Sequence, residues 1–147
     1  MINTDNAQSR KEQNKNTNKA ASLGTLPTMC AGEPRGTETG TKVARIRKLN
    51  DQLRTTGRGG MVVMTDGIAG LGTETVGQIF AAIGAFTDFN ADNDPWGEHD
   101  CARLEVGGHW VIWKVDYFDR GRRIHSPDPA DPKVTVRVMT VMLADEY

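Results

Sequence analysis

The chain has 147 residues, with 18 basic and 19 acidic side chains and a net charge of −1 at pH 7. This length has room for one domain, and no apolar run approaches the roughly eighteen residues of a membrane span, so we expect no membrane partner. The two cysteines, Cys30 and Cys101, make neither a disulfide framework nor a metal-ligand pair, and no apolar leader precedes them. We therefore expect a reducing, cytoplasmic setting.

Residues 1–41 are rich in Asn, Thr, Gln, Lys and Gly and have few large apolar side chains. Such a segment cannot offset the entropy of ordering by burying apolar surface. We expect a disordered N-terminal arm over residues 1–41 and a single α+β domain over residues 42–147.

The first expected element of the domain is a helix. Val43, Ile46, Leu49 and Leu53 recur at three- and four-residue spacing, which predicts one apolar helix face. Basic residues lie between them, so a nucleic-acid partner is one hypothesis and an ordinary solvated face is the alternative. These basic residues are Lys42, Arg45, Arg47 and Lys48.

Residues 61–65 are a short apolar, β-branched run between glycines, which predicts a buried strand. A glycine-rich connection follows over residues 67–72. Thr73 is then expected to cap a second helix. Its apolar face would contain Val76, Ile79, Phe80, Ile83 and Phe86.

Residues 88–100 concentrate carboxylate and amide side chains around one of only three histidines. The alternating spacing of the first half resembles the start of a calcium-binding loop, but neither the turn position nor the closing position has the expected residue. The alternative is a loop whose Asp and Asn side chains cap their own backbone. The possible ligands of a divalent cation are Asp88, Asn90, Asp92, Asp94, Glu98, His99 and Asp100.

Gly107 and Gly108 separate two alternating runs and predict a two-residue hairpin turn. The register then follows by counting outward from the turn. It places Ala102, Leu104, Val106, His109, Val111 and Trp113 on one side, the expected core face.

Residues 133–141 fit two patterns. Val134, Val136 and Val138 alternate as in a strand, whereas Asp131 and Pro132 are typical of a helix start. We predict a helix here. The expected fold is therefore a short antiparallel sheet with a central hairpin, packed by two to three helices.

Several motifs, in the same order along the chain, resemble one family. They are Asp92–Asp100 (DNDPWGEHD), Met61–Thr65 (MVVMT), Lys114–Asp119 (KVDYFD), Pro127–Pro132 (PDPADP) and Met142–Tyr147 (MLADEY). Over residues 43–147 the chain is similar to the small proteins of the DUF3768 type, whose function is unknown. The family is frequent in proteobacterial genomes and plasmids, which implies accessory work in a mobile-element or host-interaction setting and assigns no residue a role.

The leading functional hypothesis is a non-enzymatic binding or regulatory module that presents the acidic loop and hairpin to a protein partner. The alternative is a metal-dependent hydrolase on Glu98, His99, Asp100 and Asp116, because the hairpin places residues 100 and 115 side by side. No other cofactor is expected. The candidate functional surface contains Asp94, Gly97, Glu98, His99, Asp100, Lys114, Asp116 and Asp119.

Overall fold

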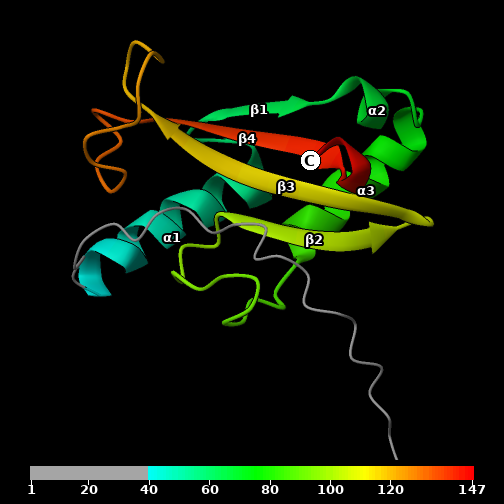
Figure 1. Ribbon diagram of the computed structural model, residues 1–147, viewed down its shortest axis with the longest axis horizontal. Coiled ribbons are helices and arrows are strands. Elements are labelled where there is room, and N and C mark those ends of the chain that lie inside the picture. Colours follow the sequence, from blue (N-terminus) through cyan, green and yellow to red (C-terminus); the bar gives the residue numbers. More distant parts are fainter. Residues whose placement is uncertain (1–39) are drawn as a thin grey trace, which may run out of the picture.

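The computed structural model describes residues 40–147. The expected arm lies outside this range, except for its last two residues, which begin the first helix. In chain order the elements are α1 (Gly40–Thr56), β1 (Met61–Met64), α2 (Asp66–Ala69), α3 (Thr73–Ala85), β2 (Cys101–Val106), β3 (His109–Phe118), β4 (Val136–Leu143) and the 3-10 turn η1 (Ala144–Glu146) (Figure 1). This content confirms the predicted α+β class in a small single domain.

The strands form one four-stranded sheet in the order β1-β4-β3-β2 (Figure 1). The β2–β3 and β3–β4 pairs are antiparallel, whereas β1 runs parallel to β4. The sheet is therefore mixed, and the prediction of an antiparallel sheet is wrong for this one pair. A parallel pair needs a long connection, and here the two helices and the hairpin provide it.

The hairpin forms as its double glycine predicts. Gly107 and Gly108 have φ values of 58° and 82°, the positive angles that a two-residue turn of this kind requires. The observed register is the predicted one. Ala102, Val111 and Trp113 are buried on its core face, so alternation alone oriented these strands correctly.

The predicted helix over residues 133–141 is wrong, because β4 occupies most of this segment. β4 lies between β1 and β3 and pairs with both. Arg137, Met139 and Val141 are buried at alternate positions. Only an extended chain can pair with two neighbouring strands at once, so tertiary pairing outweighs the helix-start signal at Pro132.

β1 is a strand, as predicted, but it is not buried. The side chains of Met61, Val62, Val63 and Met64 are each 37–43% exposed. An apolar, β-branched run looks the same in a central strand and in an edge strand. The sheet order decides between them and places β1 at the edge.

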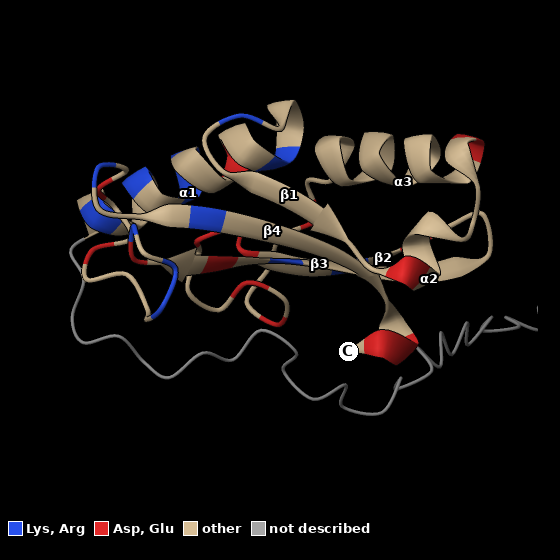
Figure 2. Cartoon of the chain, turned by 90° about the horizontal axis from the view of Figure 1, so that it is seen from above, with Lys and Arg blue, Asp and Glu red and all other residues tan. Residues whose placement is uncertain are grey.

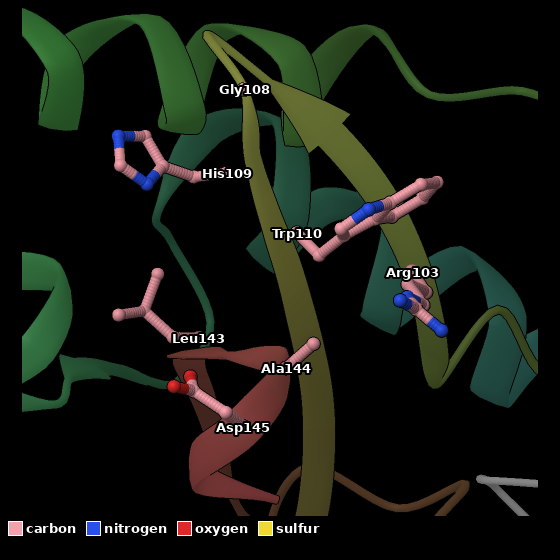
Figure 3. Close-up of a pocket in the computed structure, with 7 residues that line it drawn as sticks. All are labelled: Arg103, Gly108, His109, Trp110, Leu143, Ala144 and Asp145. Atoms are coloured by element: carbon pink, nitrogen blue, oxygen red, sulfur yellow. The ribbon is translucent and has the colours of Figure 1, made fainter.

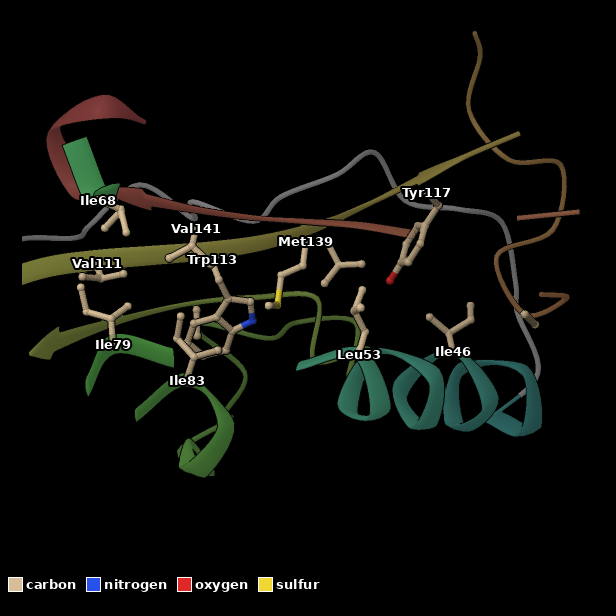
Figure 4. Close-up of a cluster of buried hydrophobic side chains, with 13 residues drawn as sticks. Ile46, Leu53, Ile68, Ile79, Ile83, Val111, Trp113, Tyr117, Met139 and Val141 are labelled. Atoms are coloured by element: carbon tan, nitrogen blue, oxygen red, sulfur yellow. The ribbon is translucent and has the colours of Figure 1, made fainter. Parts of the chain in front are cut away.

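Both long helices lie on one face of the sheet (Figure 2), and the core fills the space between helices and strands (Figure 4). Ile46 and Leu53 come from α1, Ile79 and Ile83 come from α3, and all four pack in the cluster that contains Trp113. The two predicted helices and their apolar faces are thus confirmed. On the other face of the sheet, residues 40–147 contribute no helix except η1.

Two local details differ from the sequence prediction. The glycine-rich connection after β1 contains the helical turn α2, which Thr65 caps by accepting a hydrogen bond from the Ile68 N–H at 3.5 Å. Thr73 is the first residue of α3, and Gly72, with φ 88°, is its N-cap. The α3 helix therefore begins one residue earlier than predicted, a shift that is common at helix ends.

Two further observations concern membrane-spanning helices and the cysteines. No helix within residues 40–147 is long and apolar enough to cross a bilayer. Cys101 is buried and is not a free thiol, which differs from the expected reducing setting. The other cysteine of the chain, Cys30, lies outside the described residues.

The exposed interior glycine of α3 gives a stability test. No atom lies within 4 Å of the position that a Cβ would take at Gly77, so Gly77→Ala should raise the free energy of unfolding by about 0.5–1 kcal/mol through a smaller unfolded-state entropy. Urea denaturation measures this change. Gly60→Ala is the contrasting variant and should destabilise the fold, because its Cβ would lie 2.6 Å from the Arg137 carbonyl oxygen. Equal effects of the two substitutions on the free energy of unfolding would contradict this difference in surroundings.

Candidate functional site

The first half of the acidic segment is a turn that hydrogen-bonds to itself. Asn90 Oδ1 accepts from the backbone N–H of Asp92 at 2.9 Å and of Asn93 at 3.3 Å. The Asn93 amide in turn accepts from the Asn90 N–H at 2.9 Å and donates to the Asp88 carbonyl at 2.7 Å. The side chains of Asn90 and Asn93 therefore stabilise the loop's own backbone, as Asn often does.

Asp94 caps the next turn of the same segment. It is buried, and its Oδ1 accepts from the backbone N–H of Glu98 at 2.9 Å and of His99 at 3.1 Å. Burial raises the pKa of the Asp94 carboxyl, although the hydrogen bonds from these two amides act in the opposite direction. The Asp94 carboxylate is thus engaged in shaping the approach to β2.

Gly97 and His99 both have left-handed backbones, with φ values of 65° and 53°. The Gly97 carbonyl accepts from Arg47 Nε of α1, and a Cβ on Gly97 would lie 2.8 Å from the guanidinium of that arginine. The His99 ring stacks on Phe89 with 3.7 Å between centroids, and its Nδ1 lies 2.9 Å from Asp51 Oδ1. Contacts on both sides therefore hold His99 in a conformation that costs a non-glycine residue energy.

A buried polar network joins this loop to α1 and the sheet. The Tyr117 hydroxyl donates to Glu98 Oε2 at 2.9 Å and accepts from Asn50 Nδ2 at 2.6 Å. Asn50 also donates to the Glu98 carbonyl at 2.9 Å and accepts from Arg137 Nε at 3.1 Å. These four side chains are at most 5% exposed. The network satisfies buried polar groups whose desolvation would otherwise be costly.

Lys114 and Asp116 lie on the other side of the sheet. They form an ion pair with 3.1 Å between Nζ and Oδ1. Side chains alternate along β3, so these two point away from the helices, whereas Tyr117 points toward them. Because Glu98 binds Tyr117, the structure places Glu98 and Asp116 on opposite faces of the sheet.

Asp119 directly follows β3, and Asp100 directly precedes β2. Asp119 Oδ1 accepts from the Arg123 N–H at 2.7 Å, and this bond, with others from the same turn, lowers the pKa of the Asp119 carboxyl. The Asp100 carbonyl accepts from the Val115 N–H at 2.6 Å. Asp119 thus shapes the turn after β3, and the Asp100 backbone extends the sheet pairing.

The structure brings together only part of the predicted metal set. His99 Nε2 lies 3.7 Å from Asp94 Oδ2, with Glu98 between them in sequence. Within residues 40–147, no group of three or more His, Cys, Asp and Glu side chains is arranged to hold a metal ion. A cation site on the acidic segment stays a prediction without geometric support.

The four residues of α1 that were proposed to contact nucleic acid divide into two pairs. Lys42 Nζ lies 3.1 Å from Asp128 Oδ1, and Arg47 binds the acidic segment as described above. Arg45 and Lys48 are exposed on the helix. Half of the proposed nucleic-acid surface therefore contacts the domain itself.

Sequence reasoning missed an open pocket at the turn end of the hairpin (Figure 3). It measures about 460 Å³ and is lined by Arg103, Gly108, His109, Trp110, Leu143, Ala144 and Asp145. Trp110 is 48% exposed, and the Arg103 guanidinium carbon lies 4.3 Å from the centroid of its ring. The pocket joins the hairpin to η1, so no local pattern could reveal it.

The sequence comparisons identify the family of this chain. Residues 64–146, more than half of the chain, match the family described as "Protein of unknown function (DUF3768)". The chain belongs to the DUF3768 family. No curated protein and no solved structure matched the chain. The match confirms the resemblance seen in the acidic segment and the strands, and it leaves the function open.

In this DUF3768 chain the buried network extends beyond the matched range. Glu98, Tyr117 and Arg137 lie within that range, whereas Asn50 comes from α1, before it begins. Sequence reasoning also missed Asn50. The available signal was its position on the apolar face of α1, four residues after Ile46 and three before Leu53.

Tyr117 gives this network a measurable titration. Burial, aided by the charges of Glu98 and Asp100, raises the pKa of Tyr117 well above its ordinary value of about 10. A group whose folded pKa is raised contributes stability that is present below the unfolded pKa and is lost as pH rises through the folded pKa. We expect the tyrosinate absorbance of Tyr117 to appear only with alkaline unfolding, and Tyr117→Phe to remove that step. A reversible titration of Tyr117 in the folded protein near pH 10 would contradict this expectation.

Proposed function

We propose that this domain is a non-enzymatic binding or regulatory module that docks a protein partner at the turn end of its hairpin. The observation that carries the proposal is the exposed Trp110 ring, which lies over the Arg103 guanidinium beside an open pocket. Trp and Arg are the residues most enriched among those that dominate protein-binding energy. A partner would place an apolar or aromatic side chain in the pocket, against Trp110.

The acidic segment supports a binding role better than a catalytic one. Asp94, Glu98 and His99 are engaged in bonds that position the loop, whereas Asp88 and Asp92 are exposed on its first half. The loop would therefore add a rigid, negatively charged surface to the hairpin. Such a module would suit an accessory protein encoded by a bacterial chromosome or plasmid.

The test uses a photo-crosslinking residue at exposed Glu105, beside Trp110, to capture partners in host cells. Binding of each purified partner is then measured. Trp110→Ser and Arg103→Gln should each weaken binding about tenfold or more, as expected for central interface residues. Glu74→Gln, an exposed change on α3, should leave the affinity unchanged. Partners that bind Trp110→Ser and Arg103→Gln as tightly as the native chain, or the absence of any partner, would overturn the proposal.

Divalent cations provide a separate prediction. Calcium, magnesium, manganese and zinc should leave the melting temperature unchanged, because the side chains of Asn90, Asn93 and Asp94 already bond to the backbone of the segment. A bound ion would stabilise the fold by RT ln(1 + [L]/Kd). A rise in melting temperature that is lost in His99→Ala but kept in Asp88→Ala would instead favour the hydrolase, and the reverse pattern would favour a calcium loop.

A further inference from the structure

The two edges of the sheet differ in how they are protected. β2, at one edge, carries the charged residues Arg103 and Glu105. β1, at the other, reads Met-Val-Val-Met, without a charge, a proline or a bulge. Soluble proteins usually protect such edges, because unpaired backbone groups beside apolar side chains recruit another strand. Within residues 40–147 nothing pairs with the outer side of β1.

The backbone groups available for pairing can be identified. The Thr65 N–H donates to the Val141 carbonyl of β4 at 3.0 Å. Hydrogen-bonding direction alternates along a strand, so Met61 and Val63 also direct their backbone groups at β4. Val62 and Met64 direct theirs outward.

The charges at the two ends of β1 have opposite signs. Arg58 precedes the strand, and Arg122 Nη1 lies 3.3 Å from Met61 Sδ at the same end. Asp66 follows the strand, and Glu146 Oε2 accepts from the Thr65 hydroxyl at 2.5 Å. Figure 2 looks onto this edge and shows acidic residues of α2 and η1 at the end where β1 leads into α2. No Lys or Arg occurs between Arg58 and Arg103.

We propose that β1 pairs antiparallel with β1 of a second copy of this chain, which joins two sheets into one continuous sheet. In one register, all outward backbone N–H and C=O groups of Val62 and Met64 form hydrogen bonds between the copies. Val62 of each copy then lies opposite Met64 of the other. Gly60 then faces Asp66, and Arg58 approaches the acidic end of the other copy. A two-fold axis brings each basic end to an acidic end, so the edge is complementary to itself. This interface lies outside the hairpin pocket.

The pairing segment is short, so association should be reversible and dependent on concentration. Four residues per chain bury far less than the roughly 800 Å² per partner of a standard interface. Sedimentation velocity of the full-length chain over a wide concentration range should show monomer and dimer in exchange. A monomer at every concentration would overturn the proposal.

Two edge variants test the strand. Val62→Pro removes an outward N–H without touching the bonds to β4, and Val62→Lys keeps the backbone but adds a charge that edge strands use against pairing. Both should abolish the dimer while near-ultraviolet circular dichroism shows the native fold. Trp110→Ser, which removes an even more exposed apolar side chain at the hairpin, should leave the dimer intact. A dimer that survives Val62→Lys, or that is lost in Trp110→Ser, would overturn the proposal.

A charge exchange tests the orientation. Arg58→Glu alone, or Asp66→Arg alone, should raise the dimer dissociation constant about fivefold to tenfold, because each change acts twice in a symmetric dimer. The double variant Arg58→Glu/Asp66→Arg restores opposite signs at both contacts and should recover most of the native affinity. Additive weakening in the double variant would overturn the antiparallel arrangement.

Discussion

Asn50→Leu should lower the free energy of unfolding by about 3 kcal/mol or more. Asn50 satisfies the Glu98 carbonyl, the Tyr117 hydroxyl and Arg137 Nε, and all of these groups lie in the buried network. Leucine fills a similar volume but leaves the charged Arg137 without one of its acceptors, and an uncompensated buried polar or charged group is costly. Chemical denaturation followed by circular dichroism measures the loss.

The matched control is Gln52→Leu, an exposed change on the same helix. It should alter the stability by no more than about 0.5 kcal/mol. Equal effects of the two substitutions would mean that the network contributes little to the fold. If the network does stabilise the fold, a double-mutant cycle of Asn50→Leu with Tyr117→Phe should show that the two effects are not additive, because the two side chains are in direct contact.

Trp113→Ala should cost about 3–5 kcal/mol of stability, the usual range for removing a buried aromatic side chain. Trp113 is fully buried at the centre of the core (Figure 4). Its ring makes edge contacts with Phe86 at 5.0 Å and with Phe89 at 6.3 Å between centroids. The cavity would therefore open where α3, the acidic segment and the sheet meet.

Trp113→Phe tests the contribution of the indole N–H to stability separately from that of the aromatic ring. The indole Nε1 has no hydrogen-bond partner among residues 40–147, so phenylalanine removes a buried donor together with some volume. We expect a loss well below that of alanine, because the cavity is smaller and an unsatisfied N–H disappears. A loss as large as that of Trp113→Ala would show that the N–H is satisfied in solution.

Local patterns were sufficient for several elements of this fold. The apolar spacing of α3 and the alternation around Gly107 and Gly108 predicted both segments, and the hairpin register followed by counting. These features depend on periodicity and on turn geometry, which a few neighbouring residues specify. The family resemblance likewise rested on short motifs and proved correct.

The arrangement of the sheet depended on contacts between distant segments. The local sequence of β4 predicted a helix, and that of β1 predicted a buried strand. Both predictions failed because the sequence of a strand does not show which other strands lie beside it. Placing β4 centrally made Arg137 and Met139 buried residues and left β1 at the edge. Strand propensity is largely a response to such surroundings, so it transfers poorly from sequence alone.

The acidic segment shows the same division. Its composition was enough to single out Glu98 and His99, but the chemistry of these residues depends on their partners. Asn50, Asp51 and Tyr117 come from elements far away in the chain and engage both side chains inside the domain. Residue type and spacing decided which groups were present. Burial, together with the hydrogen-bond partners that only the folded chain brings within reach, decided that Asp94, Glu98 and His99 stabilise structure.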